Sequence, residues 1–295
     1  MPTIVMMKIA KIVQREHHES EKECPHLSSR RSLQTEKIKT LLEVQALAAE
    51  QKKEGKTGLA EFLVNRTPRA VADIITTAWE IENAQETLER SKQSRIDLLI
   101  GAKNSACVEG CNGDWLSCAL EILQRNGVSR ECFANAVHEL LRKGRGKYRN
   151  VMIVGKTFIL NPLTSIYKTF CNPATGSFAW IGVEKAECIF LNDFRWSPQL
   201  IPWQDLLLLL EGHVVHFPAP KTHFSKDIDL DMDTPIFSTS KNALVYIKNG
   251  MIDERETEMM RVRWTVIQLN YQIPRDQQRD VPSCPRCFAN LLLYN

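Results

Sequence analysis

The sequence lacks any apolar run long enough to span a membrane. Its longest apolar run, Leu206 to Leu210, lies between Asp205 and Glu211, whereas a membrane-spanning helix needs about 20 apolar residues. The sequence also lacks a strong charge of either sign, because 38 Lys and Arg residues against 35 Asp and Glu residues leave a formal net charge of +3. This balance does not by itself indicate a nucleic-acid partner, so any basic surface must be local.

No dense cysteine framework is present either. The nine cysteines are scattered along the chain, and the apolar stretch 1–13 is interrupted by two lysines and has no small-residue cleavage site of a signal peptide. Scattered cysteines without a secretion signal are typical of reduced thiols in an intracellular protein. We therefore expect a soluble intracellular protein without a disulfide scaffold.

The composition is that of a folded protein. Apolar residues make up 43% and charged residues 25% of the 295 residues, which is enough for one large domain or two smaller ones. Residues 14–32 are polar, charged and aperiodic, and they predict a flexible linker. Good helix formers and helical periodicity then dominate much of the first half. We predict helices over 33–54, 67–92, 114–126 and 130–143.

The pattern changes at Gly144. A basic segment, 142–147, is followed by short apolar and β-branched runs, most of which do not alternate with polar residues. Such runs are typical of strands buried on both faces of an α/β sheet. We expect strands at 151–154, 188–191, 213–217, 235–237, 244–247 and 262–269, with helical segments at 159–170 and 203–210. The expected fold class is α/β, with a helical N-terminal half followed by an open sheet and flanking helices.

A short motif follows the first expected strand. The apolar run 151–154 leads directly into Gly155-Lys156-Thr157 and then into residues compatible with a helix. This is the context of a phosphate-binding loop, in which backbone N–H groups and a lysine hold phosphates and a Ser or Thr hydroxyl holds Mg²⁺. The tripeptide alone is not specific, because it occurs by chance in many proteins.

Further motifs follow in a fixed order. The strand expected at 188–191 ends in Asn192-Asp193, which would place a carboxylate beside a phosphate-bound metal, although an ordinary turn after a buried strand explains the same residues. A lysine-bearing loop at 218–226 comes next, followed by a run at 234–241 that ends in Thr-Ser-Lys. The last expected strand alternates, with two arginines on one face and apolar side chains on the other.

This series resembles motifs A, B, B′ and C of superfamily 3 helicases with their trailing arginine. Within that superfamily the chain is most similar to the parvovirus non-structural replication protein and its endogenous or mobile-element relatives. The resemblance covers residues 110–275, including the helical stretch before the first strand. It implies an AAA+-like P-loop NTPase sheet, ATP-dependent helicase activity, a hexamer-like ring of identical subunits on single-stranded DNA, and a location in the nucleus.

The resemblance also assigns roles to residues of the nucleotide site. ATP would be held by Gly155, Lys156 and Thr157. Mg²⁺ would be bound by Thr157 and Asp193, and Asp193 would also belong to the acid pair that activates water. Lys241, with the Thr-Ser pair that precedes it, would sense the γ-phosphate.

A second set of roles concerns partners of the site. Single-stranded DNA would be gripped by Lys221, His223 and Lys226. Either Arg261 or Arg263 would reach the ATP of a neighbouring subunit as an arginine finger, which requires a ring. The simpler alternative is that both arginines are solvated charges on an edge strand.

Three departures from the family pattern affect the ATP site. A complete phosphate loop reads Gly-x-x-x-x-Gly-Lys-Ser/Thr, whereas only Gly155, Lys156 and Thr157 are present. Three residues span at most roughly 10 Å, too little to wrap a phosphate. Asn192 stands where many relatives have a second acid, and Lys241 stands where an asparagine is usual. We therefore expect impaired ATP binding.

Two other interpretations stay open. The chain could be a non-catalytic relative that keeps the helicase fold for DNA binding or ring assembly. It could also be a shortened form of a product that has the full phosphate loop. On the helicase-like interpretation, the chain is divided into a helical region 1–110, a helical bundle 111–147, a helicase-like core 148–275 and a C-terminal tail 276–295.

The remaining candidate signals have simple explanations. Cys284-x-x-Cys287 is half of a zinc site, and Cys107-x-x-x-Cys111 could supply the other half, but ordinary thiols explain both pairs. The two histidines of 213–216 would lie on opposite faces of a strand and so could not share a metal. Trp196 and Trp203 are expected to pack in the core or a lid and not to stack on bases.

Overall fold

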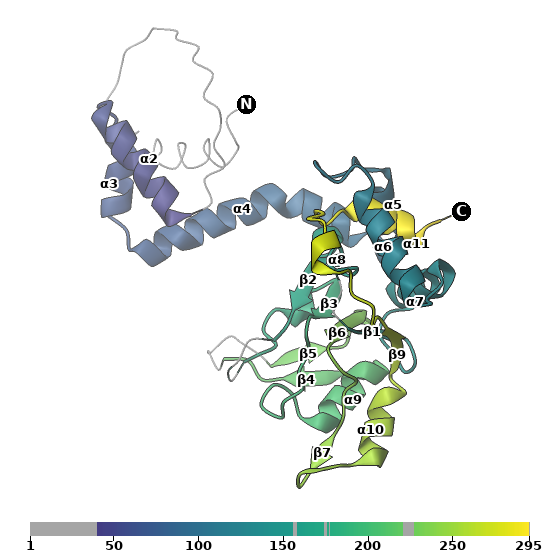
Figure 1. Cartoon of the computed structure of the whole chain (residues 1–295). Helices are drawn as coiled ribbons and strands as arrows, with labels where there is room; N and C mark the ends of the chain where they lie inside the picture. The colour runs from purple at the N-terminus through teal and green to yellow at the C-terminus, as the bar shows by residue number, and fades with distance from the viewer. Residues whose placement is uncertain (1–39, 156–157, 174–175, 177, 221–226, 295) are drawn as a thin grey trace. The chain divides into compact units, whose positions relative to one another are not determined.

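The computed structural model describes residues 40–294 except 156–157, 174–175, 177 and 221–226 (Figure 1). The chain divides into a first unit that ends at Lys92 and a second unit, Gln93–Asn295. The helix Arg95–Asn104, which falls within the expected helical region 1–110, belongs to the second unit. The predicted linker 14–32 lies outside the described residues. Within these residues, no helix is long and apolar enough to cross a membrane.

The first unit is helical where it is described. Thr40 caps the first of its helices, since its hydroxyl accepts the Glu43 N–H while the Glu43 carboxylate accepts the Thr40 N–H. Thr67 caps the last, with Pro68 at the first helical position. The three helices are α2 (Leu41–Lys53), α3 (Gly58–Val64) and α4 (Pro68–Ser91). A small apolar core holds them, consisting of Val44, Ala48, Leu59, Phe62, Val71 and Ile75.

The second unit contains a five-stranded sheet in which every pairing is parallel. Its strands, in spatial order, are β2 (Thr169–Cys171), β3 (Cys188–Leu191), β6 (Ile236–Ser240), β1 (Asn150–Val154) and β9 (Trp264–Gln268). Alternate residues of β1 pack into two different apolar clusters, Val151 and Ile153 in one and Met152 and Val154 in the other. Both faces of the sheet are therefore covered, as the unbroken apolar runs predict.

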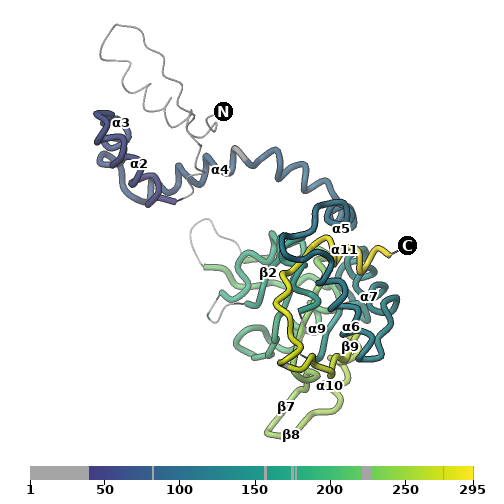
Figure 2. The backbone as a smooth tube through the Cα atoms, turned by 45° about the horizontal axis from the view of Figure 1, so that its top comes forward, coloured from purple at the N-terminus to yellow at the C-terminus, as the bar shows by residue number. Residues whose placement is uncertain are grey.

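One face of the sheet is covered by a helical bundle (Figures 1 and 2). Its helices are α5 (Arg95–Asn104), α6 (Asp114–Arg125), α7 (Arg130–Lys143) and α11 (Pro285–Leu292). Helix α11, yellow in Figure 2, contacts the other three, and its Phe288 is completely buried. Helix α11, which falls within the expected tail 276–295, completes the core of the bundle.

The opposite face packs on shorter elements. Helix α9 (Trp203–Glu211) provides most of the leucines, and Trp203 at its start packs edge-on against Trp196, with ring centroids 5.0 Å apart. The expectation that Trp196 and Trp203 pack in the core is thus confirmed. The remaining elements described in the second unit are η1 (Val183–Lys185), α10 (Glu254–Arg261), η2 (Arg275–Gln277), the turn α8 (Leu163–Ile166), which packs on the bundle side, and two antiparallel hairpins, β4 (Val215–Phe217) with β5 (Ile228–Leu230) and β7 (Ile247–Lys248) with β8 (Met251–Ile252).

Three expected elements differ from the structure. The helix expected at 159–170 is reduced to the single turn α8, followed by strand β2. The strand expected at 244–247 is absent apart from its last residue, which begins β7. The strand expected at 262–269 begins only at Trp264, because the preceding residues form α10, whose cap Asp253 accepts the Glu256 N–H.

Candidate nucleotide site

The carboxyl ends of β3, β6 and β1 lie side by side at one edge of the sheet, because neighbouring strands in this order are parallel. Asn192-Asp193 follows β3, Lys241 follows β6 and Gly155 follows β1. Three motifs that are up to 86 positions apart (241 − 155) are therefore brought to the same edge. In open α/β sheets this edge is the usual ligand site.

Gly155 is held tightly at this edge. Its N–H donates to the Ser240 carbonyl oxygen over 2.8 Å, and the Leu269 N–H donates to the Val154 carbonyl oxygen over 2.8 Å. Gly155 has a φ of +125°, and a Cβ atom there would lie 2.1 Å from the Leu269 carbonyl oxygen. Only glycine fits. Its N–H is used within the protein and cannot also serve a phosphate.

The ends of β3 and β6 are joined by side-chain hydrogen bonds. The Thr239 hydroxyl donates to Asn192 Oδ1 over 2.7 Å and accepts the Asp193 N–H over 2.8 Å. The Phe194 N–H also donates to the Thr239 carbonyl oxygen over 2.8 Å. Asn192 and Thr239 therefore fix the turn that presents Asp193. The sequence suggested roles near the phosphate for these positions, but it could not show that their polar atoms bond to each other.

Asp193 and Lys241 remain accessible. The side chain of Asp193 is 49% exposed and forms an ion pair with Arg195 at 3.3 Å, an interaction of little stabilising value at such exposure. Asp193 has a φ of +48°, a conformation that aspartate tolerates better than most residues. Lys241 is exposed at the end of β6. The edge thus presents one carboxylate and one ammonium group to solvent.

Where it is described, the segment after β1 differs from the phosphate loop that the sequence motif suggests. Lys156 and Thr157 lie outside the described residues. The helix that follows them, α8, has only four residues and begins at Leu163. A phosphate loop normally gains from the N–H groups and dipole of a longer helix that starts directly after the motif. That contribution is missing here.

A cavity of about 740 Å³ lies beside the ends of β1 and β9. Its volume is within the roughly 300–1,000 Å³ of small-molecule sites. Phe158 follows the Gly155-Lys156-Thr157 motif directly, while Tyr271 to Val281 follow β9. The lining residues are Cys118, Ile122, Phe158, Tyr271, Gln272, Ile273, Pro274, Gln278, Arg279, Asp280 and Val281.

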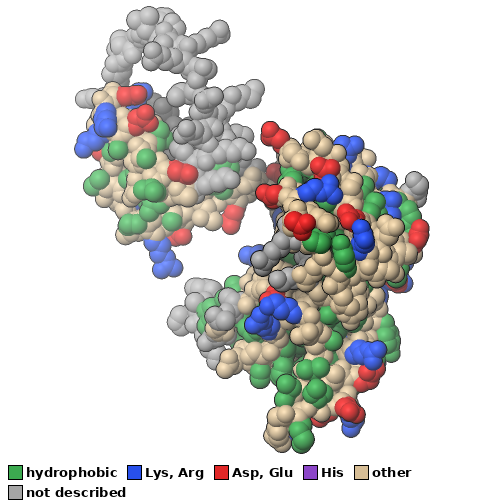
Figure 3. All heavy atoms as spheres, viewed as in Figure 1, with side chains coloured by type: hydrophobic (Ala, Val, Ile, Leu, Met, Phe, Trp, Pro, Cys, Tyr) green, Lys and Arg blue, Asp and Glu red, His purple; other side chains and the backbone are tan. Residues whose placement is uncertain are grey.

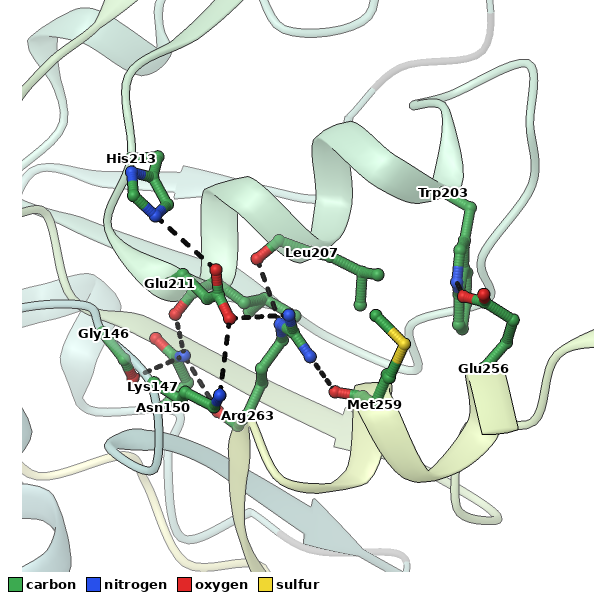
Figure 4. Close-up of polar contacts among 11 residues, drawn as sticks. Gly146, Lys147, Asn150, Trp203, Leu207, Glu211, His213, Glu256, Met259 and Arg263 are labelled. Atoms are coloured by element: carbon green, nitrogen blue, oxygen red, sulfur yellow. Dashed lines mark hydrogen bonds and ion pairs between the residues drawn. The ribbon is translucent and has the colours of Figure 1, made fainter. Parts of the chain in front are cut away.

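Arg261 and Arg263 do not share the face of a strand as expected. Arg261 ends helix α10, has a side chain 75% exposed, and lies 3.5 Å from Glu258. The Arg263 side chain is only 7% exposed and donates to Glu211 Oε1 over 2.6 Å. Figure 4 shows Arg263 also donating to the carbonyl oxygens of Leu207 and Met259. Arg263 therefore has a structural role, which leaves Arg261 as the accessible arginine of the pair.

Glu211 is the centre of this network. Besides Arg263 it lies 3.9 Å from Lys147 Nζ and 3.5 Å from His213 Nε2 (Figure 4). Nothing in the residue pattern indicated this role beyond an acid that ends a leucine-rich helix. Because Lys147 belongs to the basic segment 142–147, part of that segment's charge is balanced within the protein.

Arg145 in the same segment is buried, with a relative exposure of 2%. Its guanidinium donates to the carbonyl oxygens of Met232, Leu209 and Leu230 over 2.9, 3.0 and 2.8 Å. Burial lowers the pKa of this guanidinium from its usual value, partly opposed by two nearby aspartates. Arg145 is therefore a structural cation and not part of a DNA-binding surface.

The residues expected to contact DNA, Lys221, His223 and Lys226, lie outside the described residues. In the sequence they fall in the connection between β4 and β5, which pair as an antiparallel hairpin. The hairpin itself carries an exposed side-chain hydrogen bond between His216 Nδ1 and Asp229 Oδ1, 2.6 Å long. Whether the three residues meet DNA stays a prediction.

No family model matches the sequence, and no curated protein is significantly similar to it. The assignment of function therefore depends on the motifs and on the geometry of the second unit.

Proposed function

We propose that the chain is a superfamily 3 helicase-like protein with a weakened ATP site, which acts on single-stranded DNA as a ring of identical subunits. The observation that carries this proposal is the strand order β3-β6-β1. In this order β3 is followed by Asn192-Asp193, β6 ends in Thr-Ser and is followed by Lys241, and β1 is followed by the Gly-Lys-Thr motif. The three strands are neighbours, and their carboxyl ends lie at the same edge of the sheet.

This arrangement suits nucleotide chemistry. A carboxylate such as Asp193 can hold Mg²⁺, while the cation of Lys156 can neutralise phosphate charge. To Lys241, which follows the strand between them, we assign the role of responding to a terminal phosphate. The neighbouring cavity is large enough for a base and ribose, and Phe158 and Tyr271 offer aromatic surfaces in its wall.

The same geometry supports a weakened site. The Gly155 N–H is bonded to Ser240, and α8 is a single turn. The affinity for phosphate then depends largely on the single positive charge of Lys156, because the several backbone N–H donors of a complete phosphate loop are not available. We expect a Kd for ATP of about 1 mM, corresponding to roughly 4 kcal/mol.

Titration of a fluorescent ATP analogue with Mg²⁺ tests the proposal. Wild type should bind weakly, Lys156→Ala and Asp193→Asn should bind at least tenfold more weakly, and Lys185→Ala, an exposed lysine away from this edge, should match wild type. Inserting four residues and a glycine between Gly155 and Lys156 restores the full loop pattern, and it should raise affinity at least tenfold. No binding by either wild type or the restored form would contradict a nucleotide site.

DNA binding needs a separate test. Lys221→Ala should lower affinity for single-stranded DNA and reduce the slope of log K against log salt by about 0.7, the value for one phosphate contact. Lys185→Ala again serves as the control. An unchanged affinity and slope in Lys221→Ala would show that Lys221 makes no contact with DNA.

A second candidate function, assembly without catalysis, is favoured by the β7–β8 hairpin. Its apolar side chains are exposed, with Ile247 at 58%, Met251 at 73% and Ile252 at 58%. The lower end of the molecule in Figure 3, where Figure 1 places this hairpin, is accordingly rich in hydrophobic side chains. Clustered exposed apolar side chains mark contact sites. An assembled form of this protein without ATP turnover would favour this function over the first.

A further inference from the structure

Four cysteine thiols from opposite ends of the second unit meet at one point. Cys107 and Cys111 lie in the segment between α5 and α6, while Cys284 caps α11 and Cys287 lies in its first turn. Their Sγ atoms all lie within 4.8 Å of one another. The first and third of these residues are 177 positions apart in the sequence. Sequence spacing alone could not show that the two pairs meet, so ordinary thiols were the simpler expectation.

The sulfur–sulfur distances identify the kind of site. They are 3.5 Å for Cys107–Cys284, 3.8 Å for Cys107–Cys287 and 3.7 Å for Cys111–Cys287. A disulfide bond is far shorter, about 2.05 Å. A tetrahedral ion with metal–sulfur bonds of about 2.3 Å separates its sulfur ligands by about 3.8 Å. The four thiols therefore already have the spacing of a tetrahedral metal site.

Backbone N–H groups and turns orient the sulfur atoms of these cysteines. The N–H groups of Val108 and Cys287 bond to the thiol of Cys284, and the N–H of Gly113 bonds to that of Cys107. Gly110 and Gly113 have φ values of +77° and +90°, and the Cys111 N–H donates to the Val108 carbonyl oxygen over 3.0 Å, so that residues 107–113 form turns. Backbone N–H groups directed at sulfur stabilise thiolates and fix the orientation of metal ligands.

We propose that Cys107, Cys111, Cys284 and Cys287 bind one structural Zn²⁺ ion. Thiolate ligands in tetrahedral geometry suit Zn²⁺, and spacings of three and two residues within the pairs are those of zinc sites. Four sulfurs so close together leave room for one ion and not for an iron–sulfur cluster with its own sulfides. Because all four positions are filled by protein, the site has no open position for substrate.

The ion would join the C-terminal helix to the wall of the candidate nucleotide site. Trp115, at the start of α6, packs edge-on against Phe288 of α11 and against Phe158, with centroid distances of 5.9 and 5.6 Å. Phe158 lines the cavity of about 740 Å³. Zinc binding requires loss of the thiol protons and is coupled to folding. The proposed ion therefore stabilises the bundle independently of whether the cavity binds a nucleotide.

Elemental analysis of the purified full chain, desalted after expression with added zinc, tests the proposal. Wild type should contain about one zinc ion per chain, as a closed tetrahedral site requires. A control in which the exposed Cys132 and Cys171 are both changed to Ser should contain the same amount. The double variant Cys284→Ser/Cys287→Ser should lose at least nine-tenths of the zinc.

Several results would overturn the proposal. These are a wild type without zinc, unchanged zinc in the double variant, or iron in place of zinc with the strong visible absorption of iron thiolates. If the double variant does not fold, cobalt substitution of wild type decides. Protein stripped with a chelator under denaturing and reducing conditions and refolded with Co²⁺ should show the visible spectrum of tetrahedral cobalt thiolate, saturating at one equivalent. Absence of that spectrum in refolded wild type would overturn the site.

Discussion

At the scale of single residues, the second unit contains several charged groups that the fold uses internally. Arg263 shows this most clearly, because its guanidinium bonds to Glu211 and to two backbone carbonyl oxygens in a nearly closed environment. Two positions earlier, Arg261 is exposed and close only to Glu258 among the interactions described. Residue type and motif order do not distinguish these two arginines, whereas the exposure of their side chains does, at 75% for Arg261 and 7% for Arg263.

The first prediction compares these arginines. Arg263→Ala should lower the free energy of unfolding by roughly 3–5 kcal/mol, because it leaves Glu211 partly buried without its main partner. Arg261→Ala should change it by no more than about 0.5 kcal/mol, as is usual at exposed positions. Urea unfolding followed by far-UV circular dichroism measures both. Equal midpoints for Arg263→Ala and wild type would mean that the buried network is not formed in solution.

The second prediction concerns Gly155. Alanine at this position would need a backbone conformation with φ of +125° and would place Cβ against the Leu269 carbonyl. We expect Gly155→Ala to destabilise the second unit by roughly 3 kcal/mol or more, from strain and overlap together. Gly182→Ala is the matched control, since Gly182 also has positive φ (+90°) but open space around it. It should cost about 1–2 kcal/mol. Similar losses for both variants would show that the close approach at Gly155 is absent.

At the scale of elements, the sequence predicted best where a single local signal was strong. The strand Cys188–Leu191 was predicted with its bounds, and the helices predicted at 67–92 and 130–143 correspond to α4 and α7, which Thr67 and Ser129 cap. Helix α10 was missed because its residues are mostly charged and its one buried side chain, Met260, gives no apolar stripe. Helix α11 was missed because its apolar face completes a bundle whose other helices are distant in the sequence.

The same distinction applies to the candidate site. Local motifs placed Gly155, Asp193 and Lys241 at strand ends, and the parallel sheet brings those ends together. What could not be predicted were the partners of the polar atoms: Thr239 bonds to Asn192, and the Gly155 N–H bonds to Ser240. These bonds join segments distant in the sequence, so their existence depends on register in the sheet and not on any local pattern.

The third prediction concerns α11 as an element of the core. Phe288→Ala should lower the free energy of unfolding by about 3–5 kcal/mol, because the side chain is completely buried beside Trp115. Phe178→Ala, at a ring that is 39% exposed, should cost much less. Denaturant unfolding of both variants, monitored by tryptophan fluorescence, provides the comparison. If Phe288→Ala unfolds at the same denaturant concentration as Phe178→Ala, α11 is not docked in the bundle.

At the scale of the whole molecule, the second unit combines three structural features. A parallel sheet collects motif residues at one edge, a bundle closed by the C-terminal helix covers one face, and an apolar hairpin extends from the opposite side. A ring of subunits needs an exposed contact surface in addition to a nucleotide site. Helix α10 follows the β7–β8 hairpin directly and ends at Arg261. A neighbouring subunit that binds the hairpin would therefore lie roughly 12 Å, the length of α10, from Arg261.

The last prediction tests this contact through the hairpin. Wild type should form assemblies larger than the 33.7 kDa chain as its concentration rises, because Ile247, Met251 and Ile252 expose apolar surface that association would bury. Ile252→Glu should shift the equilibrium towards the monomer, since it would place a charge in that interface without disturbing the folded core.

Ile181→Glu is the matched control, because Ile181 is 52% exposed, comparable with the 58% of Ile252, and lies away from the hairpin in the sequence. Light scattering coupled to gel filtration over a concentration series measures the mass of each form. A wild type that stays monomeric throughout, or an Ile252→Glu variant that assembles as well as Ile181→Glu, would show that the hairpin does not hold subunits together and that Arg261 has no neighbour to reach through it.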